Sequence, residues 1–230
     1  MQTEGTASPA ATGRLMREIY FPTVIYFLDV PDAASLNDAM KAHIYAWRAQ
    51  DGEGIVRSNV RRTGAWHSRL DMHQRVEYQG LVDQVLATAR PIYEEMGYDA
   101  AYEPAIDNMW ANVNPRHAFN RSHIHPNVLW SGVYYVQAPP GAGRIYFTDP
   151  RAQAQAITAR FAPDTPRKPL AWSEVYFEPV EGRILLFPAW LMHEVEPNLT
   201  ELEGPAADRI SVSFNLIQRR RTTSDDAGTS

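Results

Sequence analysis

The chain has 230 residues, of which 44% are hydrophobic and 11% aromatic, and a formal net charge of −5. This composition fits one globular domain with a substantial core, and the acidic balance argues against nucleic acid as the main partner, because phosphate binding needs a basic surface. The absence of cysteine excludes disulfides and thiolate metal sites, so any metal must use nitrogen and oxygen ligands. We find neither an apolar run of about 18 residues for a membrane span nor the basic-then-apolar order of a signal peptide, and we therefore expect a cytoplasmic protein without a membrane partner.

The two ends of the chain differ in composition from the part between them. Residues 1–14 are rich in Thr, Ala, Ser and Gly and are expected to form a disordered tail. Residues 219–230 begin with three arginines, continue with small and polar residues, and are expected to form a flexible tail. We therefore predict a single domain over residues 15–218.

The first half of the domain predicts one strand and two helices. Tyr, Phe, Ile and Val are frequent from Ile19 to Val30, which indicates a strand. Asp32 is predicted to cap a helix that runs through about Gln50, because apolar residues follow at helical spacing. A second helix with an apolar stripe is predicted from about Gln79 to Met96.

The second half of the domain predicts a sheet protein. From Ala105 onward, short alternating or β-branched runs are separated by Pro, Gly and Asn at strand-like intervals. We predict a mainly β (α+β) fold, a double-stranded β-helix or jelly-roll barrel of the cupin-like type with supporting N-terminal helices. The predicted strands are Asn108–Asn114, Val128–Gln137, Arg144–Thr148, Ser173–Pro179, Arg183–Pro188 and Arg209–Gln218.

A histidine pair in the run Arg121–Asn127 carries the strongest chemical signal of the chain. Strand side chains alternate with period two, so His123 and His125, at the mouth of a strand, lie on the same side of the backbone. His193 follows the apolar run Ile184–Pro188 and is placed to complete a triangle from a neighbouring strand. Three imidazoles suit iron, copper, nickel or zinc and leave coordination positions open. We therefore predict that His123, His125 and His193 bind a metal and form the catalytic centre.

The remaining histidines and the nearby carboxylates are weaker candidates. Non-haem iron oxygenases use two histidines and one Asp or Glu, and His125 stands at the position of the carboxylate. Asp149 and Glu194 are the nearest alternatives, although an Asp before a proline is more typical of a turn. We interpret His43 as a packing residue of the first helix, His117 as a bystander near a turn, and His67 and His73 as residues of a polar loop.

Arg209 opens the last predicted strand, in which polar and apolar side chains alternate. Its face continues with Ser211 and Ser213, and the other face carries Ile, Val and Phe. In a barrel interior, Arg209 and Ser211 would hold the distal carboxylate of a dicarboxylic acid; the alternative is an ion pair of Arg209 with Asp208 or Glu203. Further polar groups predicted on interior faces are Asn112, Tyr134 and Asn215, and the aromatic residues that either wall the cavity or fill the core are Trp110, Trp130, Trp190 and Tyr135.

Several stretches of the chain resemble a bacterial and phage family of 2-oxoglutarate- and Fe(II)-dependent oxygenases. The resemblance covers roughly residues 18–217 and implies a double-stranded β-helix core. It also implies that His123 and His193 bind Fe(II) and that Arg209 with Ser211 holds 2-oxoglutarate as cosubstrate, while His125 departs from the carboxylate of related oxygenases. The matching stretches are Phe21–Thr23, Trp66–Ser68, Trp110–Asn114, His123–Pro126, Ser131–Val136, Phe147–Arg151, Gly182–His193 and Arg209–Asn215.

The activity implied by this resemblance is an O2-dependent oxidation, by hydroxylation, of a peptide, an amino acid or another small metabolite, with release of succinate and CO2. Two alternatives stay open: a cupin-like three-histidine dioxygenase or isomerase that does not use 2-oxoglutarate, and a non-catalytic barrel that binds a metal or another ligand. Arg209 with Ser211 favours the first hypothesis, because an enzyme independent of 2-oxo acids has no need of this pair. Substrate contacts are expected from the loops Arg57–His73 and Ala152–Arg167, and both the primary substrate and a homodimer stay open.

Overall fold

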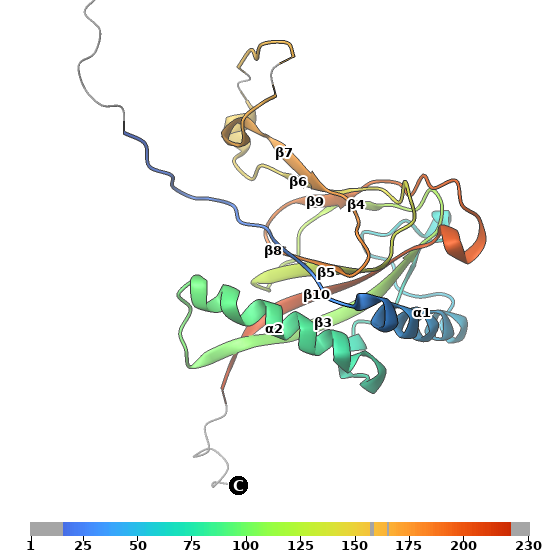
Figure 1. Ribbon diagram of the computed structural model, residues 1–230. Coiled ribbons are helices and arrows are strands. Elements are labelled where there is room, and N and C mark those ends of the chain that lie inside the picture. Colours follow the sequence, from blue (N-terminus) through green and yellow to red (C-terminus); the bar gives the residue numbers. More distant parts are fainter. Residues whose placement is uncertain (1–15, 157–158, 165, 222–230) are drawn as a thin grey trace, which may run out of the picture.

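The computed structural model describes residues 16–156, 159–164 and 166–221. The predicted tail 1–14 and residues 222–230 of the second predicted tail lie outside the described residues. The predicted fold is confirmed: two antiparallel sheets face each other as a double-stranded β-helix, and the two long helices cover the outer face of the larger sheet (Figure 1).

The long helices α1 (Ala33–Gln50) and α2 (Gln79–Glu95) begin and end within a residue or so of their predicted bounds. Asp32 precedes α1 as expected, but it adopts a left-handed conformation and its carboxylate makes no capping hydrogen bond. Among the described residues, no helix has the length and apolarity needed to cross a membrane. The short helices are α3 (Ala152–Gln155) and the 3-10 turns Arg61–Thr63, Met72–Gln74, Val76–Tyr78, Pro169–Ala171 and Gly204–Ala207.

The larger sheet has the strand order β1-β8-β5-β10-β3-β2, and the smaller sheet has the order β4-β9-β6-β7. Neighbouring strands are antiparallel throughout both sheets. The strands are β1 (Tyr26–Asp29), β2 (Trp66–His67), β3 (Tyr102–Asn114), β4 (Asn120–His123), β5 (Trp130–Gln137), β6 (Ile145–Thr148), β7 (Glu174–Phe177), β8 (Arg183–Pro188), β9 (His193–Val195) and β10 (Arg209–Arg220).

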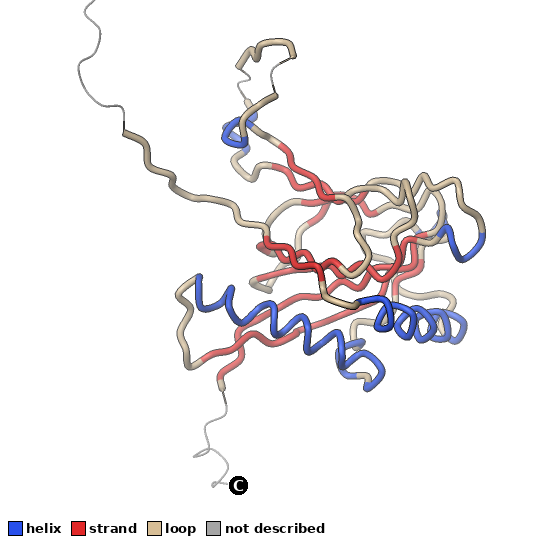
Figure 2. Tube along the Cα trace, in the orientation of Figure 1, coloured by secondary structure: helices blue, strands red, loops and turns tan. Residues whose placement is uncertain are grey.

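Several predicted strand boundaries are wrong. The strand expected to begin at Asn108 begins at Tyr102 as β3. The strand expected over Ile19–Val30 is reduced to β1, because only Tyr26–Asp29 reaches the edge of β8 to pair with it. The preceding residues run as an extended segment outside the sheets (Figure 2). The last strand does not end at Gln218 but continues to Arg220, which pairs with Tyr102 at the start of β3.

The central strands of the larger sheet are buried on both faces, and a separate apolar cluster lies against each face. On the outer face, side chains such as Val212 and Phe214 pack against Ile44 of α1 and Val85 of α2. On the inner face, a smaller cluster that includes Phe147 joins the two sheets. Each fully buried aliphatic or aromatic side chain contributes about 1.5–3 kcal/mol through removal from water. Part of the inner face carries polar side chains instead, and these line the candidate site.

Candidate active site

The three predicted histidines meet at one end of the smaller sheet. His123 of β4 lies directly opposite His193 of β9 in the antiparallel register, and His125 follows β4, where its backbone N–H donates to the carbonyl of Ala189 over 2.9 Å. One ring nitrogen from each histidine lies within 4.8 Å of the others, and the Nε2 atoms of His125 and His193 are 3.3 Å apart. Bonds of about 2.0–2.1 Å to a common metal would place two such nitrogens about 3.0–3.4 Å apart. The spacing therefore fits ligands of a single ion.

The hydrogen bonds of the rings leave the correct nitrogens free for a metal. Nδ1 of His123 lies 2.7 Å from the carbonyl oxygen of Arg121, and Nδ1 of His193 lies 2.9 Å from that of Leu191. A carbonyl only accepts, so each Nδ1 carries the proton and each Nε2 keeps its lone pair. Burial, with a smaller effect of the neighbouring histidines, lowers the pKa of His193 to about 3 and that of His125 to about 4, and burial also lowers the pKa of His123. The three rings are thus neutral near pH 7, as metal ligation requires.

A column of stacked rings supports His125. Its ring is nearly parallel to that of His193 at 5.2 Å and stacks on Trp110 at 5.8 Å. Trp110 in turn stacks on His67 at 5.3 Å with an interplanar angle of 6°. The interpretation of His67 as a polar-loop residue is wrong: it is buried in β2, and its Nδ1 donates to the carbonyl of Ser68 over 2.6 Å. His67 therefore fixes the Trp110 ring from behind instead of joining the histidine cluster.

The burial of His67 predicts a pH-dependent contribution to stability. Burial lowers the pKa of His67 to about 4, so between pH 6.5 and 4 the unfolded chain binds a proton that the folded protein does not. The free energy of unfolding should fall across this window by roughly 3 kcal/mol on account of His67 alone. Urea unfolding at pH 7 and at pH 4 should show a smaller loss for His67→Phe, which keeps a ring and cannot titrate. Parallel pH dependences of wild type and variant would contradict this. The control is His43→Gln, because the prediction of His43 as a packing residue is wrong and the structure places it exposed on α1.

Arg209 is buried without a counter-ion. It is 1% exposed, and its Nη1 donates to the carbonyl oxygens of Ala142 and of Glu196, the latter over 3.0 Å. Its Nη2 is buried and has no hydrogen-bond partner among the described residues. Burial lowers the pKa of Arg209 to about 10, so the side chain stays charged at neutral pH. A buried cation of this kind is costly unless an anion joins it.

The alternative ion pairs of Arg209 are absent from the described part of the chain. Asp208 accepts a hydrogen bond of 2.8 Å from Tyr45 and lies 3.6 Å from Arg48 instead. Glu203 is exposed at the start of a 3-10 turn. The guanidinium of Arg209 is thus available to a ligand.

One cavity between the sheets, here called the inner cavity, joins Arg209 to the histidine cluster. The side chains of Ser211 and Ser213 follow Arg209 along its wall, as the predicted alternation of β10 requires. A dicarboxylate fits this donor set, because one carboxylate would meet the unpartnered Nη2 while the other end reaches the Nε2 atoms. The lining residues that carry this argument are His123, His125, His193, Arg209, Ser211 and Asn112.

The structure separates the other predicted cavity residues into two groups. Asn112 lines the inner cavity and donates to Ser213 over 3.2 Å, and Tyr135 and Trp110 wall it. The placement predicted for Tyr134 is wrong: it faces the helices and donates to Asn37 of α1 over 2.5 Å. Asn215 lies outside the inner cavity, where it accepts a hydrogen bond from Ser131 and donates one to Asn108, both over 2.7 Å. Trp130 belongs to the hydrophobic core, and Trp190 is 53% exposed.

Neither alternative carboxylate joins the histidines. Asp149 forms a two-pronged ion pair with Arg151, with distances of 3.0 and 2.8 Å, and lines a different pocket. Glu194 is exposed, because side chains of β9 alternate and His193 takes the inward face. His117 is exposed in a left-handed turn, as expected of a bystander. Within the described residues, three histidines and no carboxylate form the cluster.

Gly143 allows the close approach of backbone to Arg209. Its φ is +87°, and an added Cβ would lie 2.6 Å from the carbonyl oxygen of Glu196 and 2.9 Å from Nη1 of Arg209. We expect Gly143→Ala to lower the free energy of unfolding by about 2–4 kcal/mol in urea unfolding. Gly97→Ala is the matched control, since Gly97 also has a positive φ of +69° but nothing within 4 Å of the added Cβ. Equal losses in the two variants would show that the clash at Gly143 is harmless.

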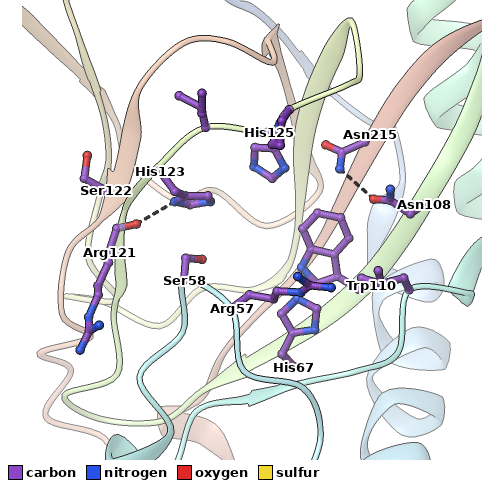
Figure 3. Close-up of a pocket in the computed structure, with 13 residues that line it drawn as sticks. Arg57, Ser58, His67, Asn108, Trp110, Arg121, Ser122, His123, His125 and Asn215 are labelled. Atoms are coloured by element: carbon purple, nitrogen blue, oxygen red, sulfur yellow. Dashed lines mark hydrogen bonds between the residues drawn. The ribbon is translucent and has the colours of Figure 1, made fainter.

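A second and larger pocket, here called the outer pocket, is also lined by His123 and His125 and has a volume of about 500 Å³ (Figure 3). Arg57, Ser58, His67 and Leu70 of the loop Arg57–His73 line it, as predicted for substrate contacts. No residue of the other predicted loop, Ala152–Arg167, lines it among those the structure describes. His123 and His125, together with Ser58 and Trp110, line both the outer pocket and the cavity of Arg209.

Comparison with known proteins indicates the class of protein in which this geometry occurs. Residues 108–215 match a family described as "Putative 2OG-Fe(II) oxygenase". This segment runs from β3 to β10 and contains the three histidines and Arg209. No curated protein is significantly similar to the chain in sequence.

Solved structures of low sequence identity share the fold. A prolyl-4-hydroxylase from Pseudomonas putida is 18% identical with a TM-score of 0.54, and the match covers 87% of this chain and 94% of that one. SnoK, a non-heme alpha-ketoglutarate-dependent carbocyclase from nogalamycin biosynthesis, is 13% identical with a TM-score of 0.59 and coverages of 89% and 84%. HygX from Streptomyces hygroscopicus, solved with nickel, 2-oxoglutarate and hygromycin B, is 12% identical with a TM-score of 0.54 and coverages of 84% and 82%.

Fold and sequence match together define an oxidoreductase of the 2-oxoglutarate-dependent class. The segment that carries the site matches the model of the 2OG-Fe(II) oxygenase family, whose cofactor and cosubstrate are Fe(II) and 2-oxoglutarate. The resemblance inferred from the sequence, the class of enzyme and the cofactors are thus confirmed, whereas the roles of individual residues stay predictions.

Proposed function

We propose that the chain is a dioxygenase that hydroxylates an amino acid, a peptide or another small metabolite with O2 and 2-oxoglutarate as cosubstrates. In the overall reaction, 2-oxoglutarate, O2 and R–H give succinate, CO2 and R–OH. Fe(II), when bound, supplies the redox chemistry of this coupled oxidation. His123, His125 and His193 would hold the metal through their Nε2 atoms.

The observation that carries the proposal is the unpaired guanidinium of Arg209 in the same cavity as the histidine nitrogens. Arg209 would bind the distal carboxylate of 2-oxoglutarate through Nη2, while Nη1 stays tied to the backbone and fixes the orientation of the guanidinium. Ser211 adds a hydroxyl on the same wall. The apolar side chains of Phe187 and Val133 exclude water from the space between the two ends.

A second candidate function has one observation in its favour. The cluster consists of three neutral imidazoles without a carboxylate, and such a set also suits copper, nickel or zinc. A three-histidine dioxygenase or isomerase independent of 2-oxo acids would have this set, but it would leave Arg209 buried without a counter-ion. Because of Arg209, we rank this candidate function second.

The experiment is to load the purified protein separately with Fe(II), Cu(II), Ni(II) and Zn(II) and to measure succinate formed from 2-oxoglutarate, with ascorbate as reductant. We expect succinate with Fe(II) in air, none with Fe(II) under nitrogen, and none with the other three metals. Binding of 2-oxoglutarate is measured in parallel by titration calorimetry under nitrogen. A protein that neither binds 2-oxoglutarate nor forms succinate with O2 would refute the proposal.

A further inference from the structure

The outer pocket is positively charged. Arg57 and Arg121 are the charged side chains among its described lining residues, and no Asp or Glu takes part in the lining. Neither arginine side chain forms a hydrogen bond or an ion pair with the part of the chain that the structure describes. The pocket therefore offers an anion unpaired guanidinium groups beside the histidine cluster.

The two amide side chains of the outer pocket, those of Asn108 and Asn215, are already committed to hydrogen bonds. Asn215 donates to Asn108 and accepts from Ser131, and the amide nitrogen of Asn108 donates to Asp107 over 2.6 Å. Amides held in this way cannot turn to follow a neutral polar substrate without breaking buried bonds. The remaining donors of the outer pocket thus include the guanidinium groups and the hydroxyls of Ser58 and Ser122, and of these only the guanidinium groups are charged.

Of the two arginines, Arg57 is the better anchor. Its side chain extends toward the side of the pocket where Trp110 and His67 lie, whereas the side chain of Arg121 points away from them (Figure 3). The positive charge of Arg57 also contributes to the low pKa of His67, after the larger effect of burial and an opposing hydrogen bond. Arg57 therefore lies on the pocket wall formed by the ring column.

The segment that presents Arg57 is fixed to the barrel. The backbone N–H of Arg57 donates to the buried Asn59 over 2.6 Å, and Asn59 forms an isolated bridge with Asn120 of β4. The carbonyl of Ser58 accepts from the backbone of Arg121 over 3.0 Å, and its hydroxyl accepts from Asn120 over 3.1 Å. The anchor thus has a defined position relative to His123, which ends the same strand.

The net charge of the histidine cluster with its metal also favours an anion in the outer pocket. Three neutral imidazoles leave the charge of a bound divalent cation unreduced, whereas a site with one carboxylate ligand reduces it by one. 2-Oxoglutarate brings two negative charges and Arg209 one positive charge, so the loaded centre would still carry a net positive charge. An anionic group in the outer pocket would offset it.

We propose, on the basis of the function proposed above, that the substrate of this enzyme carries an oxyanion, a carboxylate or a phosphate, that binds to Arg57 in the outer pocket. The volume of about 500 Å³ suits a small organic acid or one acidic side chain with its neighbouring atoms. Trp110 supplies an apolar surface for the carbon skeleton, and the oxyanion fixes which carbon faces the histidines.

The test uses three compound pools matched in size, one of carboxylic acids and phosphate monoesters, one of the corresponding amides and alcohols, and one of amines. Each pool is added to the Fe(II)-loaded enzyme with 2-oxoglutarate, and the increase in succinate formation over the rate without a pool is measured. We expect stimulation by the acidic pool, which falls as the salt concentration rises. Splitting that pool into carboxylates and phosphates then distinguishes the two oxyanions. Stimulation by the neutral or amine pool, or by none, would overturn the proposal.

Variants of Arg57 test whether the anion of the substrate binds to this residue. For the stimulating acid, Arg57→Gln should raise the concentration for half-maximal stimulation about tenfold or more, and Arg57→Lys should recover part of the loss. Arg62→Gln is the matched control, because Arg62 is exposed in the same loop and lines no described pocket. An unchanged concentration in Arg57→Gln would overturn the assignment. Succinate formation without any pool tests the function itself, so a failure of the substrate proposal is distinguishable from a failure of the oxygenase proposal.

Discussion

Replacement of Arg209 by methionine is expected to weaken 2-oxoglutarate binding at least about 100-fold and to leave the metal in place. The guanidinium is buried, charged and unpartnered at Nη2, so it has the largest free energy to gain from a carboxylate. Methionine keeps an unbranched stem, shorter than that of arginine, and cannot donate a hydrogen bond. Because the histidine cluster lies at the other end of the inner cavity, its ligand atoms should be unaffected. Titration calorimetry under nitrogen measures the affinity, and elemental analysis after dialysis measures the metal.

Two further variants control this result. Arg209→Lys keeps the charge but loses the planar fork, so its affinity should lie between wild type and Arg209→Met. Arg183→Met removes an arginine of the same larger sheet that pairs with Asp29 over 2.6 Å outside the cavity, and its 2-oxoglutarate affinity should match wild type. The two backbone carbonyls that lose a donor in Arg209→Met make a melting temperature necessary for each variant. Loss of metal, or an unchanged affinity in a folded Arg209→Met, would refute the assigned role.

The sequence allowed us to predict which face of β10 points into the barrel, because the two faces of this strand differ in polarity. Arg209, Ser211 and Ser213 alternate with Ile210 and Val212, and the structure places the first set toward the inner cavity and the second toward the helices. The chemical contrast between neighbouring residues of β10 thus encodes the direction of their side chains. The meeting of His123 and His193 was predicted from the histidine pair and from the apolar run before His193, but the strands that carry them, β4 and β9, were not among the predicted strands.

The face of β5 was not predictable, because both faces of this strand are apolar or aromatic. Tyr134 and Tyr135 are both buried, one against α1 and the other in the inner cavity, and alternation alone cannot assign them. A central strand buried on two sides reads as a continuous apolar run. His67 was missed because β2 has only two residues, too few for any periodicity, although Trp66–Ser68 is one of the stretches that resemble the oxygenase family.

Replacement of His125 by alanine is expected to lower the metal affinity more than about 100-fold, since even the loss of an outer partner of a ligand commonly costs 10–100-fold. The Nε2 atom of His125 is 3.3 Å from that of His193, a distance that two neutral imidazoles tolerate poorly unless one donates to the other or a cation lies between them. Competition with a chelator at fixed pH measures the affinity. His117→Ala, which removes an exposed histidine from a turn, should behave as wild type. A wild-type affinity in His125→Ala would reduce the site to two histidines.

The variant His125→Asp tests whether position 125 needs an imidazole in particular or only a side chain that can bind the metal. It introduces the carboxylate of related oxygenases, but the aspartate is shorter than histidine and has no ring to stack on Trp110 and His193. We therefore expect His125→Asp to bind the metal more weakly than wild type and more tightly than His125→Ala. An affinity equal to or above that of wild type would mean that the ring column adds nothing to metal binding. Affinities that fall from wild type through His125→Asp to His125→Ala would mean that stacking on Trp110, itself held by His67, favours an imidazole over a carboxylate at position 125. The barrel would then determine that the metal site lacks a carboxylate and carries a greater positive charge.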